Sequence, residues 1–341
     1  MKKILTKINL LLIFILTAVL FAGCKKDENE GYANPQVTKV NVTEGAGGAV
    51  VIIEGKDLAS IKNITFEIDN VPVNFNPALN NSNAVIFRVP ETAKPGVQNI
   101  LLTNAADIQI KVPFKVLALA AVTSIWPYDF EEGTTVTLTG SNLATTTRVL
   151  LTASSSEATI VSAEDDRLVI IMPASIAEKT KLAITNEAGS RTSDFELYNV
   201  NKAVKLYTEE WPSEYFESWS WGGTYSASNE QKVTGNVSIK AVYDADGAFR
   251  LHSKFGVDPV SIDDNKILSF NIKGGAASTS LLIRVNENAA YDKTITVPAN
   301  KWINFRIPVE GWIAGLSISD IWFQNQGAAT TLYFDNILLV K

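Results

Sequence analysis

The chain has 341 residues, of which 46% are hydrophobic, and its formal net charge is -6. This length predicts two or three domains, each able to bury a core. The acidic balance excludes a basic nucleic-acid-binding surface, so we expect no nucleic-acid partner. Cys24 is the only cysteine, which excludes an intramolecular disulfide.

Residues 1–23 have the pattern of a lipoprotein signal peptide. Three lysines form a charged head, and an apolar run interrupted only by Thr17 extends over residues 10–22. The run is too short to cross a bilayer comfortably. It ends in Phe-Ala-Gly-Cys, which resembles the bacterial lipobox, although Phe21 stands where Leu is usual. The resemblance implies lipidation of Cys24. The alternative is a plain secretory signal with an unmodified cysteine.

Residues 24–33 are predicted to be a short acidic and lysine-containing tether. Lys25 and Lys26 directly follow the cysteine, and acidic residues follow them. This order resembles the surface-export signal of Bacteroidota lipoproteins. The resemblance implies a lipid-anchored protein of the cell outer membrane that faces the exterior. A solvated spacer without an export role is the alternative.

Residues 34–117 and 118–199 are predicted to be two copies of one domain. Val37-Thr38 recurs as Val122-Thr123. The same register then pairs Gly48 with Gly133, Val51 with Val136, Gly55 with Gly140 and Leu58 with Leu143, and slightly shifted registers pair Val89-Pro90 with Met172-Pro173, Thr103-Asn104 with Thr185-Asn186, and Phe114 with Phe195. A register that holds over so many positions indicates a duplicated domain.

Each copy has the pattern of an immunoglobulin-like sandwich. Apolar and polar residues alternate with period two, as in Val136-Thr137-Leu138-Thr139, and Gly-x-x-Leu turns follow. Several short strands within about 80 residues are typical of such a sandwich. The motifs resemble the IPT/TIG family. The resemblance implies that both copies are spacers or interaction modules.

Residues 200–341 are predicted to form a jelly-roll β-sandwich. About nine strands alternate apolar and polar residues, so that two sheets can pack on their apolar faces. Asp244 to Gly247 and the pair Gly222-Gly223 are predicted to turn the chain. The all-β class of the whole chain is therefore two tandem IPT/TIG sandwiches followed by a jelly roll.

The C-terminal domain carries six of the seven tryptophans and has motifs that resemble jelly-roll carbohydrate-binding modules. These motifs are Lys301-Trp302 with the strand that follows it, and the closing segment 333–340. The lipobox, the repeats and this domain together resemble the surface glycan-binding lipoproteins of Bacteroidota. The resemblance implies a polysaccharide or oligosaccharide partner, and a neighbouring TonB-dependent glycan importer with its surface lipoprotein.

The candidate glycan-binding residues combine flat aromatic rings with polar groups. A pyranose presents C–H-rich faces to an aromatic ring and hydroxyl groups to amides, carboxylates and guanidinium groups. Trp219 and Trp221 would share one face of a strand, and three further strands would place polar side chains in one sheet. The candidates are Trp219, Trp221, Tyr225, Arg250, His252, Arg284, Asn286, Trp322 and Gln324. Tryptophans that only seal the sandwich and a solvated sheet face are the alternatives.

Enzyme motifs are missing from the sequence. There is no Gly-x-Ser-x-Gly elbow, no cysteine nucleophile besides Cys24, and a single histidine. We expect no enzymatic activity, no cofactor and no metal. A structural calcium at Asp335 with Glu209 or Glu214 is the alternative. A non-catalytic adhesin, a protein-interaction or structural module, or an accessory to a separate hydrolase are the alternative functions.

Overall fold

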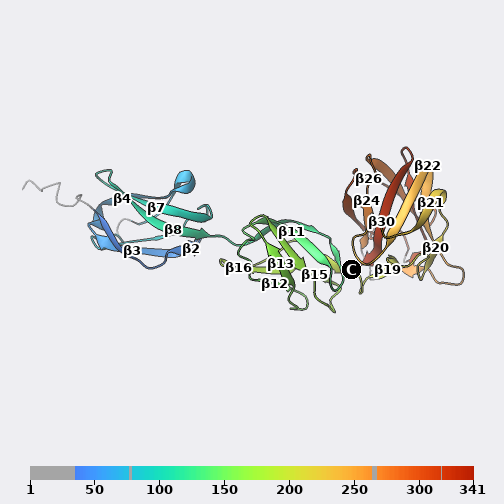
Figure 1. Ribbon diagram of the computed structural model, residues 1–341, viewed down its shortest axis with the longest axis horizontal. Coiled ribbons are helices and arrows are strands. Elements are labelled where there is room, and N and C mark those ends of the chain that lie inside the picture. The colour runs from blue at the N-terminus through green and yellow to red at the C-terminus, as the bar shows by residue number, and fades with distance from the viewer. Residues whose placement is uncertain (1–34, 77–78, 263–266, 316) are drawn as a thin grey trace, which may run out of the picture. The chain divides into compact units, whose positions relative to one another are not determined.

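The computed structural model of the protein describes residues 35–76, 79–262, 267–315 and 317–341. The described chain is built from β-strands (Figure 1), and it includes the short 3-10 turns η1 (Leu58–Ser60) and η2 (Ile68–Asn70). Within these ranges, no helix has the length and apolar character needed to cross a bilayer. The predicted all-β class is confirmed. The predicted signal peptide, Cys24 and the tether lie outside the described residues.

The first compact unit of the chain ends at Ala118 and is a two-sheet sandwich. Its sheets run in the orders β1 (Gln36–Val40), β3 (Val50–Lys56), β6 (Ala84–Arg88), and β2 (Glu44–Ala46), β8 (Gln109–Leu117), β7 (Gly96–Asn104), β4 (Ile61–Phe66), β5 (Val71–Pro72). The rings of Phe66 and Phe114 meet edge-on in its core, with centroids 5.8 Å apart.

The second unit, Leu119–Lys341, begins with a sandwich of the same kind. Its sheets run in the orders β13 (Thr159–Ala163), β14 (Arg167–Ile171), β11 (Thr135–Ser141), β9 (Ala121–Trp126); β12 (Arg148–Leu151), β16 (Leu182–Asn186), β17 (Gly189–Thr192); and β10 (Asp129–Phe130), β18 (Leu197–Asn199), β15 (Lys179–Thr180). Leu143, which corresponds to Leu58 of the first copy, is fully buried as Leu58 is.

The recurring glycines have a backbone reason in both copies. A Cβ atom on Gly55 would lie 1.9 Å from the carbonyl oxygen of Gln36, and one on Gly140 would lie 1.8 Å from that of Ala121. Strands β1 and β3, and likewise β9 and β11, can therefore pair only if glycine stands at these positions. Gly48 and Gly133 both have positive φ, 81° and 85°, a conformation that glycine adopts readily.

The C-terminal domain is the predicted β-sandwich. In the part of it that the structure describes there are twelve strands, not the nine expected, and several are short: β19 (Val204–Tyr207), β20 (Phe216–Ser218), β21 (Trp221–Ser228), β22 (Ser238–Ser253), β23 (Val260–Ser261), β24 (Ile267–Lys273), β25 (Thr279–Val285), β26 (Asn288–Val297), β27 (Trp302–Pro308), β28 (Ser317–Ile318), β29 (Asp320–Asn325) and β30 (Thr330–Val340). The two layers enclose a core rich in aromatic rings, with Phe249, Phe323 and Phe334 fully buried.

Strand β22 belongs to both layers of this sandwich. Its first part pairs with β30 and β21, in a layer that continues through β24 to β27. Its last part, from Ala248 onward, pairs with β20 and β29, in a layer that continues through β25 to β26. We call this second layer the site layer.

The predicted turn at residues 244–247 is wrong, because β22 continues through it from one layer to the other. The predicted turn at Gly222-Gly223 is also wrong. Strand β21 continues to Ser228, and its pairing with β22 shifts register between Trp221 and Gly223. A Cβ atom on Gly247 would lie 1.8 Å from the carbonyl oxygen of Gly222. The glycines thus let two strands cross closely where a turn was expected.

A polar and aromatic junction connects the second IPT/TIG copy to the C-terminal domain. Asn271 of β24 donates a side-chain hydrogen bond to the carboxyl group of Asp129 in β10. The guanidinium carbon of Arg306 lies 4.0 Å from the ring centroid of Tyr128 and 4.8 Å from that of Tyr198. Burial raises the pKa of Asp129 to about 6, while Asn271 and Arg306 oppose this rise.

Candidate functional site

A row of stacked side chains crosses the outer face of the site layer. Strands β25, β29 and β22 are neighbours, and their register pairs Arg284 with Trp322 and Trp322 with Arg250. Trp219 and His252 extend the row beyond Arg250. We call these five residues the Trp–Arg row. Residues that alternate with them, such as Ile283, Phe323 and Leu251, are fully buried beneath it.

Trp322 lies at the centre of the row and is partly buried by it. The guanidinium carbons of Arg250 and Arg284 lie 4.6 Å and 5.2 Å from its ring centroid, and they come from the strands on either side. Trp221 meets Trp322 edge-on, with centroids 5.4 Å apart and an interplanar angle of 89°. Trp322 therefore packs the polar groups into position, and its ring is not the open surface that its polar sequence neighbours suggested.

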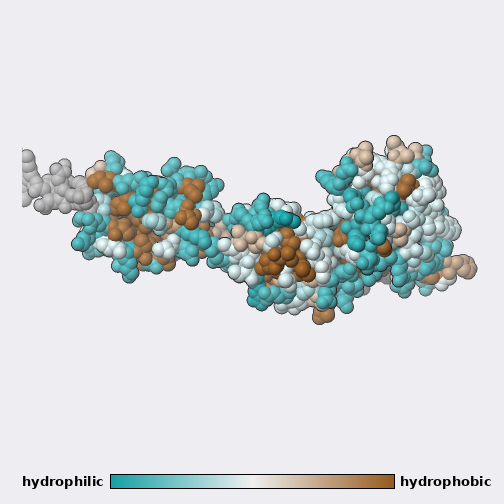
Figure 2. All heavy atoms as spheres, viewed as in Figure 1, coloured by the Kyte–Doolittle hydropathy of each residue, from teal (hydrophilic) through white to brown (hydrophobic). Residues whose placement is uncertain are grey.

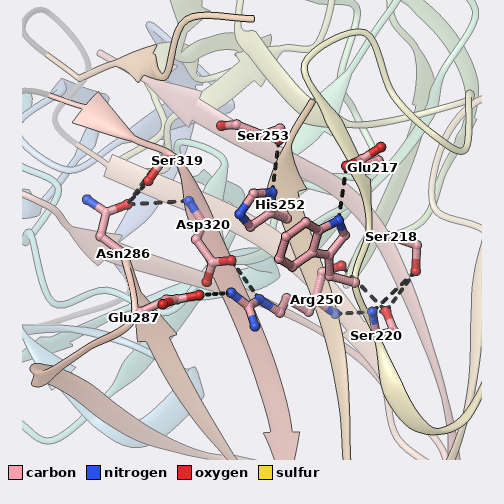
Figure 3. Close-up of polar contacts among 11 residues, drawn as sticks. Glu217, Ser218, Ser220, Arg250, His252, Ser253, Asn286, Glu287, Ser319 and Asp320 are labelled. Atoms are coloured by element: carbon pink, nitrogen blue, oxygen red, sulfur yellow. Dashed lines mark hydrogen bonds and ion pairs between the residues drawn. The ribbon is translucent and has the colours of Figure 1, made fainter. Parts of the chain in front are cut away.

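Trp219 and Trp221 provide the open aromatic surface of the site. Their exposed fractions are 50% and 38%. The Trp219 ring stacks on His252, with centroids 3.7 Å apart and planes 3° apart, and its indole N–H donates to Glu217 Oε1 at 3.0 Å. Glu217 and His252, the residues that make these two contacts, are labelled in Figure 3. One side of the ring is thereby fixed, and the other exposed surface can meet a ligand.

The prediction that Trp219 and Trp221 share one face of a single strand is wrong. Strand β20 ends at Ser218 and β21 begins at Trp221, so Trp219 lies between strands. The Trp219 backbone N–H donates to the Arg250 carbonyl at 3.2 Å, and the Ser220 hydroxyl accepts from the Arg250 N–H at 2.9 Å (Figure 3). These bonds to β22 hold the connecting segment over the row.

Four carboxylates hold the row in place, and sequence reasoning missed all of them. Arg250 donates to Asp320 at 2.6 Å and also to Glu287 (Figure 3). Arg284 donates through Nε and Nη2 to the two oxygens of Asp292, at 2.6 Å and 2.7 Å. Glu217, the fourth, accepts from Trp219. Asp320 precedes Trp322 by two residues on β29, so alternation could have identified it. The positions of the other three carboxylates beside the row become evident only in the folded structure.

Burial and ion pairing move the pKa values of these acids in opposite directions. Burial raises the pKa of Asp320, and its hydrogen bond and charge interaction with Arg250 oppose that rise. The hydrogen bond from Arg284 lowers the pKa of Asp292, which is more exposed.

Three other candidates bind neighbouring protein groups around the row. Asn286 has φ of 55° in the turn after β25, and its Oδ1 accepts from the Ser319 N–H at 2.9 Å while its Nδ2 donates to the Ser317 carbonyl at 2.9 Å. The Tyr225 hydroxyl donates to the Trp221 carbonyl at 2.9 Å. Gln324 donates to the Asp246 carbonyl at 3.4 Å. Asn286 and Tyr225 therefore position the segments that carry site residues.

The alternative of a structural calcium at Asp335 with Glu209 is not supported by the contacts of these two residues. Asp335 is buried, and its two oxygens accept from the backbone N–H groups of Val233, Thr234 and Asn336. Glu209 likewise accepts from backbone N–H groups of the same loop, at residues 236 and 237. Burial raises the pKa of Asp335 to about 8, and the N–H donors oppose this rise. Carboxylates that accept from amides hold the loop, and no cluster of metal-binding side chains occurs among the described residues.

Comparison with known proteins identifies the two repeated domains. The family model for the IPT/TIG domain matches residues 35–115 and 120–198. The two amino-terminal sandwiches are therefore IPT/TIG domains, as their recurring glycines and strands predicted. No curated protein matches the chain.

Solved structures of surface glycan-binding proteins are similar to the chain as a whole. One is SGBP-B from a complex xyloglucan utilization locus in Bacteroides uniformis, with 18% identity, 90% of this chain and 99% of that chain covered, and a TM-score of 0.49. Another is PbSGBP-B from Prevotella bryantii, with 15% identity, coverage of 91% and 99%, and a TM-score of 0.49. A third is SGBP-B of the Bacteroides ovatus mixed-linkage glucan utilization locus, with 12% identity, coverage of 90% and 76%, and a TM-score of 0.36.

Proposed function

We propose that the C-terminal domain binds polysaccharide at the Trp–Arg row and Trp221, without catalysing a reaction. The observation that carries this proposal is the exposure of Trp219 and Trp221, 50% and 38%, beside fixed polar groups. A large exposed aromatic surface on a soluble domain indicates a contact site. Covering the open face of one indole would contribute about 2 kcal/mol. The hydrogen bonds of the surrounding carboxylates and guanidinium groups would orient the sugar.

The state of the carboxylates favours binding over hydrolysis. A glycosidase needs one carboxylic acid that can protonate the leaving group and a second carboxylate across the cleft. Here Asp320, Glu287 and Asp292 form ion pairs with arginines, and Glu217 accepts from an indole. Such carboxylates position rings and guanidinium groups, which is a binding role.

We further propose that a lipid at Cys24 anchors the chain to the outer membrane and that the domain captures glycan outside the cell. The apolar run and lipobox-like sequence before Cys24, and the lysine and acidic residues after it, support this. The two IPT/TIG domains would then act as spacers, and many copies on one surface would raise avidity over a weak single site. A TonB-dependent glycan importer and its surface lipoprotein are the proposed partners.

The direct test is binding of the mature chain, which is the chain without the predicted signal peptide (residues 1–23), to a panel of plant, fungal and host polysaccharides. Affinity electrophoresis screens the panel, and calorimetry measures the dissociation constant of each hit. A single site of this kind should bind in the micromolar-to-millimolar range, since it offers few direct hydrogen bonds and two open rings. Failure to bind any polysaccharide of the panel would contradict the proposal.

Apolar surface on the IPT/TIG domains favours a second candidate, a protein-binding surface module. Val97 of the first domain is 79% exposed, and Val161 and Ile176 of the second are 56% and 86% exposed. Figure 2 shows apolar side chains on the visible face of both domains. Acrylamide quenching separates the candidates. Glycan should protect indoles from the quencher if the first is right, and it should have no effect if only the second is right.

A further inference from the structure

We infer that the site selects uncharged polysaccharides and discriminates against those that carry carboxylate or sulfate groups. This inference rests on the proposed function and specifies its ligand class. It follows from the charge balance of the Trp–Arg row and from the way in which its arginines are already paired.

The charges around the row are mostly negative. Four carboxylates, of Glu217, Glu287, Asp292 and Asp320, surround the two guanidinium groups of Arg250 and Arg284. With His252 counted as neutral, the row and its partners carry an excess of two negative charges.

The two arginines are not open receptors for an anion. The Arg250 side chain is only 12% exposed, and it pairs with Asp320, which is 3% exposed, and with Glu287. Asp292 accepts two parallel hydrogen bonds from the Arg284 guanidinium group, the geometry in which arginine binds a carboxylate most strongly. An incoming sugar carboxylate would find both guanidinium charges already neutralised by these acids and would meet the negative charges that remain in excess.

A neutral sugar meets neither obstacle. Hydroxyl groups can donate to the carboxylate oxygens of Glu217, Glu287 and Asp292, whose side chains reach the surface, Glu287 with 60% exposure and Asp292 with 27%. Each guanidinium group has five N–H donors, of which the ion pairs described above use two, so the others can donate to sugar oxygens without breaking an ion pair. The same groups that repel an anion therefore hydrogen-bond a polyol.

The experiment compares one glycan backbone with and without charge. The mature chain is titrated with the neutral polysaccharide that binds best, and with the same polysaccharide after selective oxidation of its C6 hydroxyl groups to carboxylates. At low ionic strength the oxidised form should bind about five-fold more weakly, since two excess charges at roughly 8 Å act on each sugar carboxylate. At about 0.5 M salt the difference should fall below about two-fold, because screening acts over a few ångströms.

The Glu287→Gln variant tests whether these carboxylates cause the discrimination. It removes one negative charge in an exposed turn, so it should reduce the low-salt difference to about two-fold. Glu164→Gln removes the same charge from an exposed position between β13 and β14 of the second IPT/TIG domain and should leave the difference unchanged.

The outcomes separate this inference from the proposed function. Equal or tighter binding of the oxidised form, or a panel in which only acidic polysaccharides bind, overturns the inference and leaves glycan binding intact. An equal loss of both ligands in Glu287→Gln overturns it as well, because charge selection predicts unequal effects. If no polysaccharide binds in any form, the proposed function itself fails and the inference fails with it.

Discussion

The two IPT/TIG domains and the C-terminal domain use their distinctive residues in opposite ways. In the repeats, the residues that recur are those that the backbone requires, such as Gly55 and Gly140, where any side chain would strike a neighbouring strand. In the C-terminal domain, the distinctive tryptophans are only partly needed for packing, because Trp219 and Trp221 keep much of their surface exposed. Recurrence of a residue thus indicates a constraint of the fold, whereas the exposure of large apolar rings is the basis of the proposed binding function.

The largest effect on stability should come from Gly140→Ala. Its Cβ atom would lie 1.8 Å from the Ala121 carbonyl oxygen, so β9 and β11 would have to separate. We expect a loss of about 3 kcal/mol or more in the free energy of unfolding, in the upper range for single substitutions. All seven tryptophans lie in the second unit, so urea unfolding followed by indole fluorescence reports on this unit alone.

Gly133→Ala is the matched control for this comparison. Gly133 has φ of 85°, but a Cβ atom on it would meet no neighbouring atom within 4 Å, so alanine there should cost only about 1–2 kcal/mol of backbone strain. Equal effects of the two substitutions would contradict this account, because the close approach of β9 to Gly140 would then cost no more than the backbone strain at Gly133.

The second-largest expected effect is a pH-dependent change in the free energy of unfolding, caused by Asp129 at the junction between the second IPT/TIG domain and the C-terminal domain. The pKa of Asp129 is about 6 in the folded chain, above the ordinary value of 3.8, because the group is buried. Between about pH 4 and pH 6 the folded state therefore holds a proton that the unfolded state has lost. The resulting contribution to the free energy of unfolding is up to about 3 kcal/mol. It is complete below pH 4 and is lost as the pH rises through 6.

Asp129→Asn isolates this contribution. Asparagine cannot titrate but can still accept from Asn271, so the difference in stability between wild type and variant should vary over pH 4 to 6 and be constant above about pH 7. Urea unfolding at constant ionic strength measures that difference, and other titrating groups cancel in it. A difference that is flat across the whole range would show that Asp129 stays ionised in the folded chain.

Much of the architecture followed from local patterns in the sequence. Alternation along β25, β29 and β22 correctly placed Arg284, Trp322 and Arg250 on the face opposite the core, and the recurring glycines and leucines located both IPT/TIG domains. These patterns are local because a strand's alternation and a turn's glycine depend on a few neighbouring residues.

The parts that were missed depend on contacts between distant segments. The continuity of β22 through residues 244–247 depends on Gly222, which lies in another strand, so the same residues read alone indicated a turn. Trp322 looked exposed because its flanking arginines come from different strands. Asp292, Glu287 and Glu217 gained roles only when hairpins and register brought them to Arg250, Arg284 and Trp219.

The smallest effect on folding and the most direct test of function should come from the double variant Trp219→Ala/Trp221→Ala. Both rings are largely outside the core, so we expect a loss of less than about 2 kcal/mol in stability. Calorimetry of the folded variant with the bound polysaccharide should show at least about 100-fold weaker binding, since two stacking surfaces are lost. Truncation of the exposed Ile176 to alanine, in the second IPT/TIG domain, should leave binding unchanged. Wild-type affinity in the folded double variant would contradict a glycan site at these tryptophans.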